Sequence, residues 1–594
     1  MTMDEGVSSS GRQRWLWRTY AALAALRVVA SVFFVGMVHP DEFFQSQEVM
    51  ARHALAAAQP QLAQQLFVPW EFLPDAPNRS VLFPALVAGA PFQLLQWLHV
   101  PLSGLALLLT PRLLLCALSF TIDGILFAVT GKLLRRSNAS NVRAQQIEKL
   151  VVFASAWPAW VLLARPFSNS FETLVLALCL ATLHIVGPHR RVGFGLLHLQ
   201  TLVLGALLAV GFFTRFTFAV FFLPIGVQLV FNQDTVRLEA HAKRDKSTPS
   251  LLRRVVAAFA IGVQGLLAFL VTATVMIAID TVYFRPETLH QTWPEQVRKL
   301  VIAPLNNLVY NLQYDNLELH GVHPRITHIA VNMPMLFGPV AILFLVQVFR
   351  RREWRQHDVF GVVSALFPIV MLSLAPHQEP RFLLPAIVPL HIFTATQSLV
   401  QSRAAILLWI VFNAALGLFF GVLHQGGIVP LLLALSSGPS AWSVFAPACD
   451  FNTSTLAALP LPPADVALPL VFSKTYMPPR FLLAGVPPIA AFHVVDLGGK
   501  SVSELPRVLA RESIELKAWT TMGPEASALL AFPGGIGADT LVEKSAFIKS
   551  WTRVGSCGPH ISTEDFATPF TLELYHLSVS TAPLSDLMLH NSSE

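Results

Sequence analysis

The stretch Tyr20–Gln45, YAALAALRVVASVFFVGMVHPDEFFQ, decides the fold class, because an apolar run of membrane-spanning length ends at two adjacent carboxylates. A bilayer core about 30 Å thick needs about 20 apolar residues in a helix, and Tyr20–Val38 meets that need. Asp41 and Glu42 follow at the membrane boundary, where a desolvated carboxylate is costly. One interpretation is a helix start, since Pro and acids favour the first turn. The other is a base positioned for chemistry at the lipid–water boundary.

The composition indicates many such helices. Of 594 residues, 54% are hydrophobic and 13% are charged, whereas a soluble domain carries about 25% charged residues. The net charge of +6 comes from short basic clusters between apolar runs, which is typical of membrane topology and not of nucleic-acid binding. Arginines precede the first span and no cleavage site of small residues follows it, so we expect an uncleaved anchor with residues 1–19 in the cytosol.

Apolar segments and the positive-inside rule predict a mainly α, polytopic membrane protein with about eleven transmembrane helices. The apolar run Phe83–Leu98 is short and broken by two prolines and a glycine, so we expect interfacial or re-entrant helices there, within a lumenal loop over residues 39–101. The expected spans cover residues 20–38, 103–130, 149–164, 172–187, 193–213, 217–231, 255–280, 329–349, 358–375, 382–400 and 404–424.

The chain is expected to divide near residue 425. Residues 20–425 would form the transmembrane domain and residues 426–594 a small lumenal α+β domain, with candidate strands in Thr475–His493 and Ala518–Phe532. Cys449 and Cys557 share this tail, and whether they form a disulfide stays open because sequence does not show proximity. Lumenal sequons make three asparagines candidates for N-glycosylation: Asn78, Asn452 and Asn591.

Polar clusters lie at the predicted lumenal ends of the spans. Arg and His donors there suit a phosphate at the end of a lipid, and a carboxylate suits deprotonation of a hydroxyl. One base with several cations is the set that sugar transfer from a lipid phosphate needs, because the cations stabilise the leaving phosphate. The candidates besides Asp41 and Glu42 are His39, Arg165, Asn169, Arg215, His320, His323, Arg325, His377, Glu379 and Arg381.

Plainer interpretations stay open for several of these side chains. Arg165 and Arg381 also suit anchoring of span ends by snorkelling. Ser168 and Asn169 precede an acidic first turn, and we expect them to cap a helix.

The histidines and Glu379 have alternatives as well. Glu379 favours pairing with Arg381 or His377 over a role as the base. His320 and His323 also suit an ordinary loop, and no third close ligand completes a metal site beside them. The sequence contains no Walker loop or dinucleotide glycine pattern, so nothing predicts the use of ATP or NAD.

Three motifs together resemble the glycosyltransferase family of lumenal mannosyltransferases with the GT-C fold: HPDE at 39–42, RPFSNSFE at 165–172 and HQEPRFLLP at 377–385. That family takes mannose from dolichyl-phosphate mannose and acts in N-glycan precursor and glycosylphosphatidylinositol (GPI) anchor assembly in the endoplasmic reticulum. Further stretches resemble the branch that adds the fourth GPI mannose, namely residues 39–49, 69–72, 79–84, 304–325 and 474–480. The third-mannose and N-glycan enzymes of the family remain alternatives.

The resemblance implies inverting transfer to the 2-hydroxyl of the third mannose of a GPI precursor. Asp41 is the expected general base, and Glu42 is expected to orient it or the acceptor. The expected donors to the leaving phosphate are His377 and Arg381, with help from His323 and Arg325. The expected partners are the lipid-linked donor, the glycolipid acceptor and membrane lipids; no metal or nucleotide is expected to be required, and the oligomeric state is left open.

The chain departs from the family pattern at three places. Pro166 follows Arg165, Phe216 follows Arg215 where relatives tend to carry proline, and Gln378 stands in a loop that often reads His-Lys-Glu. We expect these changes to affect packing or donor contacts.

A transporter is the alternative from a different class of protein. Its signature would be ionisable residues near span centres. The charges here lie mostly at span ends, with Asp123 and Asp280 as the main exceptions.

Overall fold

The structure is a computed structural model that describes residues 9–187, 191–192, 197–245, 250–313, 315–316, 321–437, 448–451, 468–485, 492–500, 504, 525–537, 548–562 and 566–580. The chain packs as two compact units. Unit 1 contains Met1–Ser31, Pro69–Ala85 and Leu113–Ala414, and unit 2 contains Val32–Val68, Leu86–Arg112 and Ala415–Glu594.

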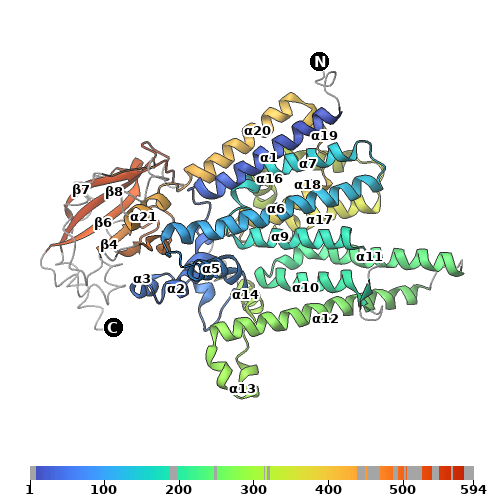
Figure 1. The fold of residues 1–594 in the computed structure, drawn as a ribbon, viewed down its shortest axis with the longest axis horizontal. Coiled ribbons are helices and arrows are strands. Elements are labelled where there is room, and N and C mark those ends of the chain that lie inside the picture. The colour runs from blue at the N-terminus through green and yellow to red at the C-terminus, as the bar shows by residue number, and fades with distance from the viewer. Residues whose placement is uncertain are drawn as a thin grey trace. The chain divides into compact units, whose positions relative to one another are not determined.

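Unit 1 is a bundle of apolar helices (Figure 1). It shares α1 (Ser9–Phe33), η3 (Ala85–Gly89), α6 (Gly104–Arg136) and α20 (Arg403–Leu418) with unit 2. Its other elements are η2 (Trp70–Phe72), α4 (Leu82–Pro84), α7 (Val142–Ser155), α8 (Trp157–Val161), α9 (Ser168–Ala181), η4 (Thr182–Val186), β1 (Arg191–Val192), β2 (Leu197–His198), α10 (Leu199–Thr214), α11 (Phe218–Asp245), α12 (Leu251–Phe284), η5 (Pro286–His290), α13 (Trp293–Arg298), α14 (Ala303–Leu312), η6 (His328–Asn332), α16 (Met333–Arg350), α17 (Gln356–Leu372), η7 (Pro380–Ala386), α18 (Ile387–Phe393) and α19 (Gln397–Gln401).

The prediction of a mainly α, polytopic membrane fold is confirmed. In the described residues, seven helical segments are long and apolar enough to cross a membrane: Gly11–Phe33, Gly104–Arg136, Ser168–Val186, Phe218–Val236, Leu251–Phe284, His328–Arg350 and Arg403–Leu423. Three shorter apolar helices, Leu199–Thr214, Gln356–Leu372 and Pro380–Phe393, match further predicted spans.

The predicted span at 149–164 is not one continuous helix. Helix α7 ends at Ser155, Ala156 is extended, and α8 begins at Trp157. Pro158 lies in the first turn of α8 and has no N–H with which to continue the hydrogen bonds of α7.

The two acidic residues near span centres have structural partners within unit 1. Arg27 Nη1 of α1 donates to Asp123 Oδ1 of α6 at 3.0 Å, and Tyr20 Oη donates to the other carboxylate oxygen at 2.8 Å. Asp280 of α12 accepts hydrogen bonds from Ser80 Oγ and from the backbone N–H of Val81, each at 2.9 Å. Both carboxylates therefore hold helices in place, which removes the main feature that favoured a transporter.

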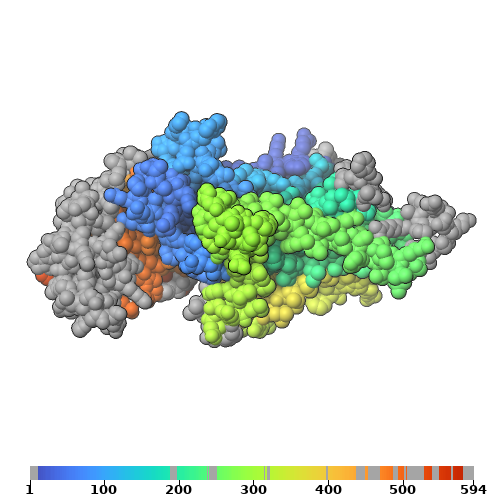
Figure 2. All heavy atoms as spheres, turned by 90° about the horizontal axis from the view of Figure 1, so that it is seen from below, coloured from blue at the N-terminus to red at the C-terminus, as the bar shows by residue number. Residues whose placement is uncertain are grey.

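Helix α12 carries an apolar surface that faces outward. Phe259, Leu267 and Val271 are among its strongly exposed side chains. Figure 2 shows α12 and the segment after it, in green, at the front of the molecule in that view. Such an outward apolar face on a helix of spanning length is what contact with lipid requires.

Unit 2 combines short helices of the first loop with a six-stranded sheet in the order β3-β7-β8-β6-β4-β5. Strand β4 pairs parallel with β5 and β6, and the other pairs are antiparallel. Its elements are η1 (Phe43–Gln47), α2 (Glu48–Leu55), α3 (Pro60–Gln65), α5 (Ala90–Trp97), η8 (Phe419–Leu423), α21 (Ile428–Ser437), β3 (Cys449–Phe451), β4 (Leu468–Phe472), η11 (Arg480–Leu483), β5 (Phe492–Asp496), β6 (Glu525–Pro533), η13 (Gly534–Ile536), β7 (Ile548–Cys557) and β8 (Leu572–Ser580).

The sheet confirms the expectation of a C-terminal α+β region but changes its strands. The predicted segment Ala518–Phe532 contains most of β6. In the predicted segment Thr475–His493, residues 475–485 contain η11 and no strand, and β5 begins at Phe492. Pro478 and Pro479 explain why residues 475–485 form no strand, because each lacks the N–H donor that a strand ladder needs.

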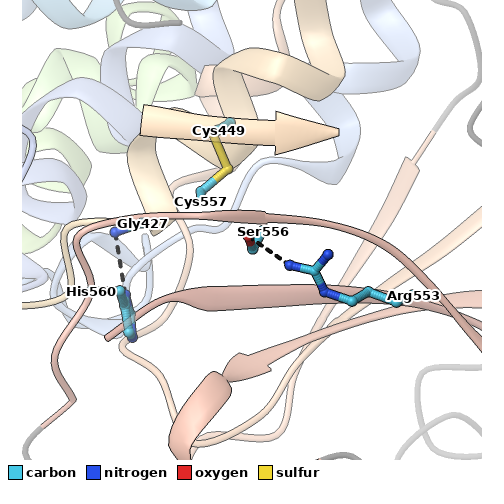
Figure 3. The surroundings of a disulfide bond; sticks show 6 residues. All are labelled: Gly427, Cys449, Arg553, Ser556, Cys557 and His560. Carbon is cyan, nitrogen blue, oxygen red and sulfur yellow. Dashed lines mark hydrogen bonds between the residues drawn. A yellow bond between two sulfur atoms is a disulfide. The ribbon is translucent and has the colours of Figure 1, made fainter. Parts of the chain in front are cut away.

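A disulfide joins β3 to β7, as Figure 3 shows, and links Cys449 to Cys557. In the same view, the backbone N–H of Gly427, just before α21, donates to His560 Nδ1 at 3.2 Å. The end of β7 is therefore tied both to the edge strand and to the segment that enters α21.

Candidate active site

The loop that carries Asp41 lies in unit 2, and the helix begins at this residue. The backbone N–H of Phe43 donates to Pro40 O at 2.9 Å, so the helix-start interpretation is correct. Gln45 Nε2 donates to Asp41 Oδ2 at 2.5 Å, and the Asp41 backbone N–H donates to His39 Nδ1 at 3.2 Å. His39 Nδ1 also lies 3.4 Å from Asp41 Oδ1, and the Asp41 side chain is 22% exposed, so solvent still reaches this carboxylate.

Glu42 has the opposite surroundings. Its side chain is fully buried, and Arg112 donates to Glu42 Oε1 through Nε at 2.8 Å and through Nη2 at 2.5 Å. The same guanidinium donates to Phe34 O at 2.9 Å. Arg112 therefore fixes both ends of the turn that presents Asp41, and sequence analysis missed it because it lies inside an apolar span.

The Tyr476 ring lies between His39 and His424 within unit 2 and contacts both. The Tyr476 ring lies 6.4 Å from His39 and 5.2 Å from His424 between centroids. His424 Nδ1 lies 2.6 Å from Met37 O, which holds this imidazole beside the same turn. Tyr476 belongs to residues 474–480, one of the stretches that carry the family resemblance, and that was its one signal in the sequence.

Glu48 connects the first loop to η11. Its carboxyl oxygens accept the backbone N–H groups of Phe67 at 3.1 Å and Phe481 at 3.2 Å. Burial raises the pKa of Glu48 to about 7, although these bonds and the nearby charge of Arg480 oppose the shift. A carboxyl in this position changes charge close to neutral pH.

A second polar group lies in unit 1, at the start of η7. His377 Nε2 lies 2.7 Å from Glu379 Oε1, and Arg381 Nε donates to Glu379 Oε2. The sequence predicted that Glu379 pairs with Arg381 or with His377, and in the structure it contacts both. Burial lowers the pKa of His377, but the hydrogen bond and charge of Glu379 raise it by more, so its pKa lies above the ordinary value.

The Phe382 ring brings a second arginine into this group. The Arg215 guanidinium lies 4.8 Å from the ring centroid and that of Arg381 lies 5.4 Å from it. Such stacking is attractive because the ring face is electron-rich. We call Arg215, Arg381 and His377 the cation cluster; Phe382 spaces its two arginines.

Residues of the RPFSNSFE motif hold Arg215. Ser168 Oγ accepts from Arg215 Nη1 at 3.2 Å, and Glu172 Oε2 lies 3.6 Å from Arg215 Nε and accepts from Asn169 Nδ2 at 3.3 Å. The expected cap is wrong, because Phe167 is the N-cap of α9 and no side chain caps it. The polar side chains of this turn bind the arginine and the carboxylate instead.

Gln378 organises the loop beside the cation cluster. This buried side chain accepts from the His328 backbone N–H at 2.8 Å and donates to the carbonyl of Ser373 at 2.9 Å. Its own backbone N–H donates to His323 Nδ1 at 3.3 Å. The departure from a His-Lys-Glu loop thus replaces a charge with an amide that ties three segments together.

The remaining predicted residues have varied positions. The His323 ring lies 5.8 Å from the His377 ring between centroids, tilted by 53°. Arg325 donates to Leu374 O, and its own carbonyl accepts from Gln378 Nε2 at 3.3 Å. Arg165 is buried rather than snorkelling. His320 lies outside the described residues.

Of the three sequon asparagines, Asn78 lies within the described residues. Asn78 is buried and its Nδ2, the atom that a glycan would modify, donates to Ala76 O at 3.2 Å. The carbonyl of Asn78 accepts from Asn307 Nδ2 at 3.1 Å, so this asparagine has a structural role that speaks against glycosylation. Asn452 and Asn591 lie outside the described residues.

The two groups differ in the chemistry that they can perform. An oriented, accessible carboxylate can accept a proton from a hydroxyl. Two stacked arginines and a protonatable histidine can bind phosphate oxygens and stabilise charge that develops on them. Among the described residues, no three His, Cys, Asp or Glu side chains gather in a way that could hold a metal ion.

Comparisons with known proteins agree with this chemistry. The sequence pattern of the Alg9-like mannosyltransferase family matches residues 18–441. Human GPI alpha-1,2-mannosyltransferase 4 is 33% identical over 585 residues, which cover 93% of this chain and 90% of that protein. GPI mannosyltransferase 4 of Aspergillus oryzae is 32% identical over 476 residues, 79% of this chain and 78% of that protein.

A solved structure supports the fold. ArnT from Cupriavidus metallidurans, in a crystal structure bound to undecaprenyl phosphate, superposes with a TM-score of 0.50 and 13% identity, over 96% of this chain and 98% of that one. At this identity the likeness shows the predicted GT-C-like fold alone. With the family pattern matched over most of its length, the chain belongs to the Alg9-like mannosyltransferase family and is a glycosyltransferase.

Proposed function

We propose that this protein transfers mannose from dolichyl-phosphate mannose, in α-1,2 linkage, to the third mannose of a GPI precursor. The observation that carries the proposal is the 33% identity with human GPI alpha-1,2-mannosyltransferase 4 across 93% of this chain. The motif and site residues agree with it, since they supply one accessible carboxylate and a cluster of cations.

Asp41 is the proposed general base. The acceptor 2-hydroxyl loses its proton to the Asp41 carboxylate as its oxygen forms a bond to C1 of the donor mannose. The bond between C1 and the phosphate oxygen breaks in the same displacement, and dolichyl phosphate leaves with the electron pair. A β-linked donor then gives an α-linked product, which is inversion in one step.

Gln45 and Glu42 support that role differently. The amide of Gln45 holds one Asp41 oxygen at 2.5 Å, which orients the carboxylate without adding charge. Glu42 acts as a positioning residue, because its buried pair with Arg112 fixes the turn on which Asp41 is carried.

The cation cluster is the proposed binding group for the donor phosphate. Arg381 and His377 lead, and Arg215, spaced from Arg381 by Phe382, is the third cation. Electrostatic groups that are fixed before reaction stabilise a leaving phosphate without reorganising. His323 supports this group through its contact with the His377 ring, and Arg325 steadies the adjacent loop.

The proposed location is the endoplasmic reticulum membrane, with the Asp41 loop and the cation cluster on the lumenal side. The apolar helices and the basic clusters between them support this orientation. The donor and the acceptor are then the two lipid-linked partners, and no metal or nucleotide takes part in the proposed step.

The test uses purified protein with dolichyl-phosphate mannose and separate GPI precursors that carry two or three mannoses. Transfer to the three-mannose acceptor alone, with a product sensitive to an α-1,2-specific mannosidase, is the expected result. Transfer to the two-mannose acceptor instead would assign the protein to the third-mannose step. Transfer to neither by folded protein would reject the GPI acceptor.

A further inference from the structure

A groove runs between α11 and α17 of unit 1, away from the residues assigned to catalysis. Its volume is 620 Å³, within the range of about 300–1,000 Å³ that small-molecule sites occupy. Most of its lining is apolar, and much of that lining is exposed, with Phe231 at 55%, Leu223 at 52% and Val363 at 40%. On helices of a membrane bundle, such a groove opens toward lipid.

One end of the groove is polar. Arg254 Nη2 donates to Asp234 Oδ2 at 2.6 Å, and Arg254 Nε donates to the same oxygen at 3.1 Å. Thr235 and Gln356 line the groove at this end as well. Both charged side chains stay partly exposed, at 44% for Arg254 and 19% for Asp234, so further groups can still reach them.

The polar end lies opposite the cation cluster along the helices. Helix α17 begins at Gln356 beside the groove and ends at Leu372, just before His377. Helix α11 begins at Phe218, just after Arg215, and reaches Asp234 more than four turns later. A headgroup at Arg254 therefore belongs to the other leaflet from a phosphate held at Arg381.

The length of the groove fits one leaflet. Its lining on α17 extends from Gln356 to Phe367, which is about 16 Å at the rise of an α-helix. Half of a bilayer core is about 15 Å. An acyl chain of an ordinary phospholipid spans that distance.

We propose that this groove binds a zwitterionic glycerophospholipid of the phosphatidylethanolamine type. One acyl chain lies between α11 and α17, the lipid phosphate contacts Arg254, and the ammonium contacts Asp234. The adjacent opposite charges favour a headgroup that carries both signs, because a purely anionic headgroup would meet the Asp234 carboxylate beside the guanidinium.

The experiment is native mass spectrometry of the purified full chain, released from nanodiscs that contain equal amounts of phosphatidylethanolamine and phosphatidylglycerol. V363W fills the groove, and V370W is the matched control, because Val370 is exposed on the same helix but does not line the groove. Wild type and V370W should retain one phosphatidylethanolamine, and V363W should retain about tenfold less.

The headgroup is tested with the charge pair. D234N should lower the ratio of phosphatidylethanolamine to phosphatidylglycerol by about fivefold, since it leaves the guanidinium without its carboxylate. R254Q should lower retention of both lipids, and its surface position avoids the folding risk of V363W.

Equal retention by V363W and V370W, when both elute as folded monodisperse protein, would overturn the site. An unchanged lipid ratio in D234N would overturn the assignment of the headgroup. If V363W does not fold, full retention by R254Q would overturn the proposal.

Discussion

The segment His39–Glu48 of unit 2 and the segment His377–Phe382 of unit 1 each contain a carboxylate beside a histidine, but the two carboxylates are held differently. Asp41 Oδ2 accepts from the neutral amide of Gln45, Asp41 Oδ1 lies 3.4 Å from His39 Nδ1, and the side chain remains 22% exposed. Both oxygens of Glu379 are engaged by cations, one with His377 and one with Arg381. A carboxylate that neutralises two cations is a poor proton acceptor, so the difference supports the proposal that Asp41 is the base and that Glu379 positions the cations.

The same comparison applies to neighbours in sequence. Asp41 and Glu42 are adjacent, yet Glu42 is fully buried against Arg112. Loss of one should therefore affect rate, and loss of the other should affect stability.

The largest expected effect on rate is that of D41N. It keeps an oxygen for Gln45 but cannot accept the proton, so transfer should fall about 10²- to 10⁴-fold, which is the value of general-base catalysis. The measurement is kcat with both lipid substrates saturating, alongside the thermal unfolding temperature. Full activity in folded D41N would show that Asp41 is not the general base.

R381Q should follow, because it removes a cation that Glu379 positions. Loss of a fixed donor to a developing charge costs about 10²- to 10³-fold in rate. R381K is the matched control, because it keeps the positive charge but lacks the planar guanidinium that lies over Phe382. It should recover part of the rate. Equal activity in R381Q and wild type would remove Arg381 from the phosphate site.

E42Q should change stability rather than chemistry. It leaves the buried Arg112 guanidinium without its counter-charge, and breaking such a pair costs about 3–5 kcal/mol in free energy of unfolding. Denaturation in detergent measures this loss, with E295Q in the exposed capping turn of α13 as a control that should change little. A rate loss in E42Q without a stability loss would place Glu42 in the chemistry.

E48Q tests the pH dependence of unit 2. The folded pKa of Glu48 is about 7, above its ordinary 4.5, so the folded state prefers the neutral carboxyl. Stability should therefore fall as pH rises from 4.5 to about 7, by at most about 3 kcal/mol. E48Q should flatten this fall in thermal unfolding measured across that interval; an identical slope would show that Glu48 ionises freely.

The smallest effect concerns His377. Its raised pKa means that the imidazolium is present below that pKa and is lost as pH rises through it. The donor kcat/KM of wild type should decline on this alkaline side, and H377Q should be lower by about tenfold at low pH but should lack the decline. A decline of equal size in H377Q would assign it to another group.

The membrane fold was predictable because long apolar runs have few alternatives in a bilayer. The sheet was predictable only in part, since the predicted segment Ala518–Phe532 contains most of β6 but β4 was missed. Its five residues are all buried, so it has no alternating pattern, and a short apolar run of this kind reads equally as helix or strand. Residues 475–485 of the predicted strand segment contain η11 instead, because Pro478 and Pro479 lack the N–H donors that a strand needs.

The site was predictable where a motif kept its charges close together in sequence, as at Asp41 and at His377. It was not where partners are distant. Arg112 lies 70 residues from Glu42, inside an apolar helix that hydropathy marks as lipid-spanning. Phe382 looked like an apolar residue, and its place between two guanidinium groups depends on the packing of α10, α11 and η7.

The most direct test is the partition of kcat and donor KM in D41N and E379Q, measured side by side on folded protein. The account predicts that D41N loses about 10²-fold or more in kcat with the donor KM unchanged. E379Q should raise the donor KM and keep most of kcat at saturation, because its cations lose their positions but the base remains. A collapse of kcat in E379Q with near-normal kcat in D41N would contradict the assignment and make Glu379 the base.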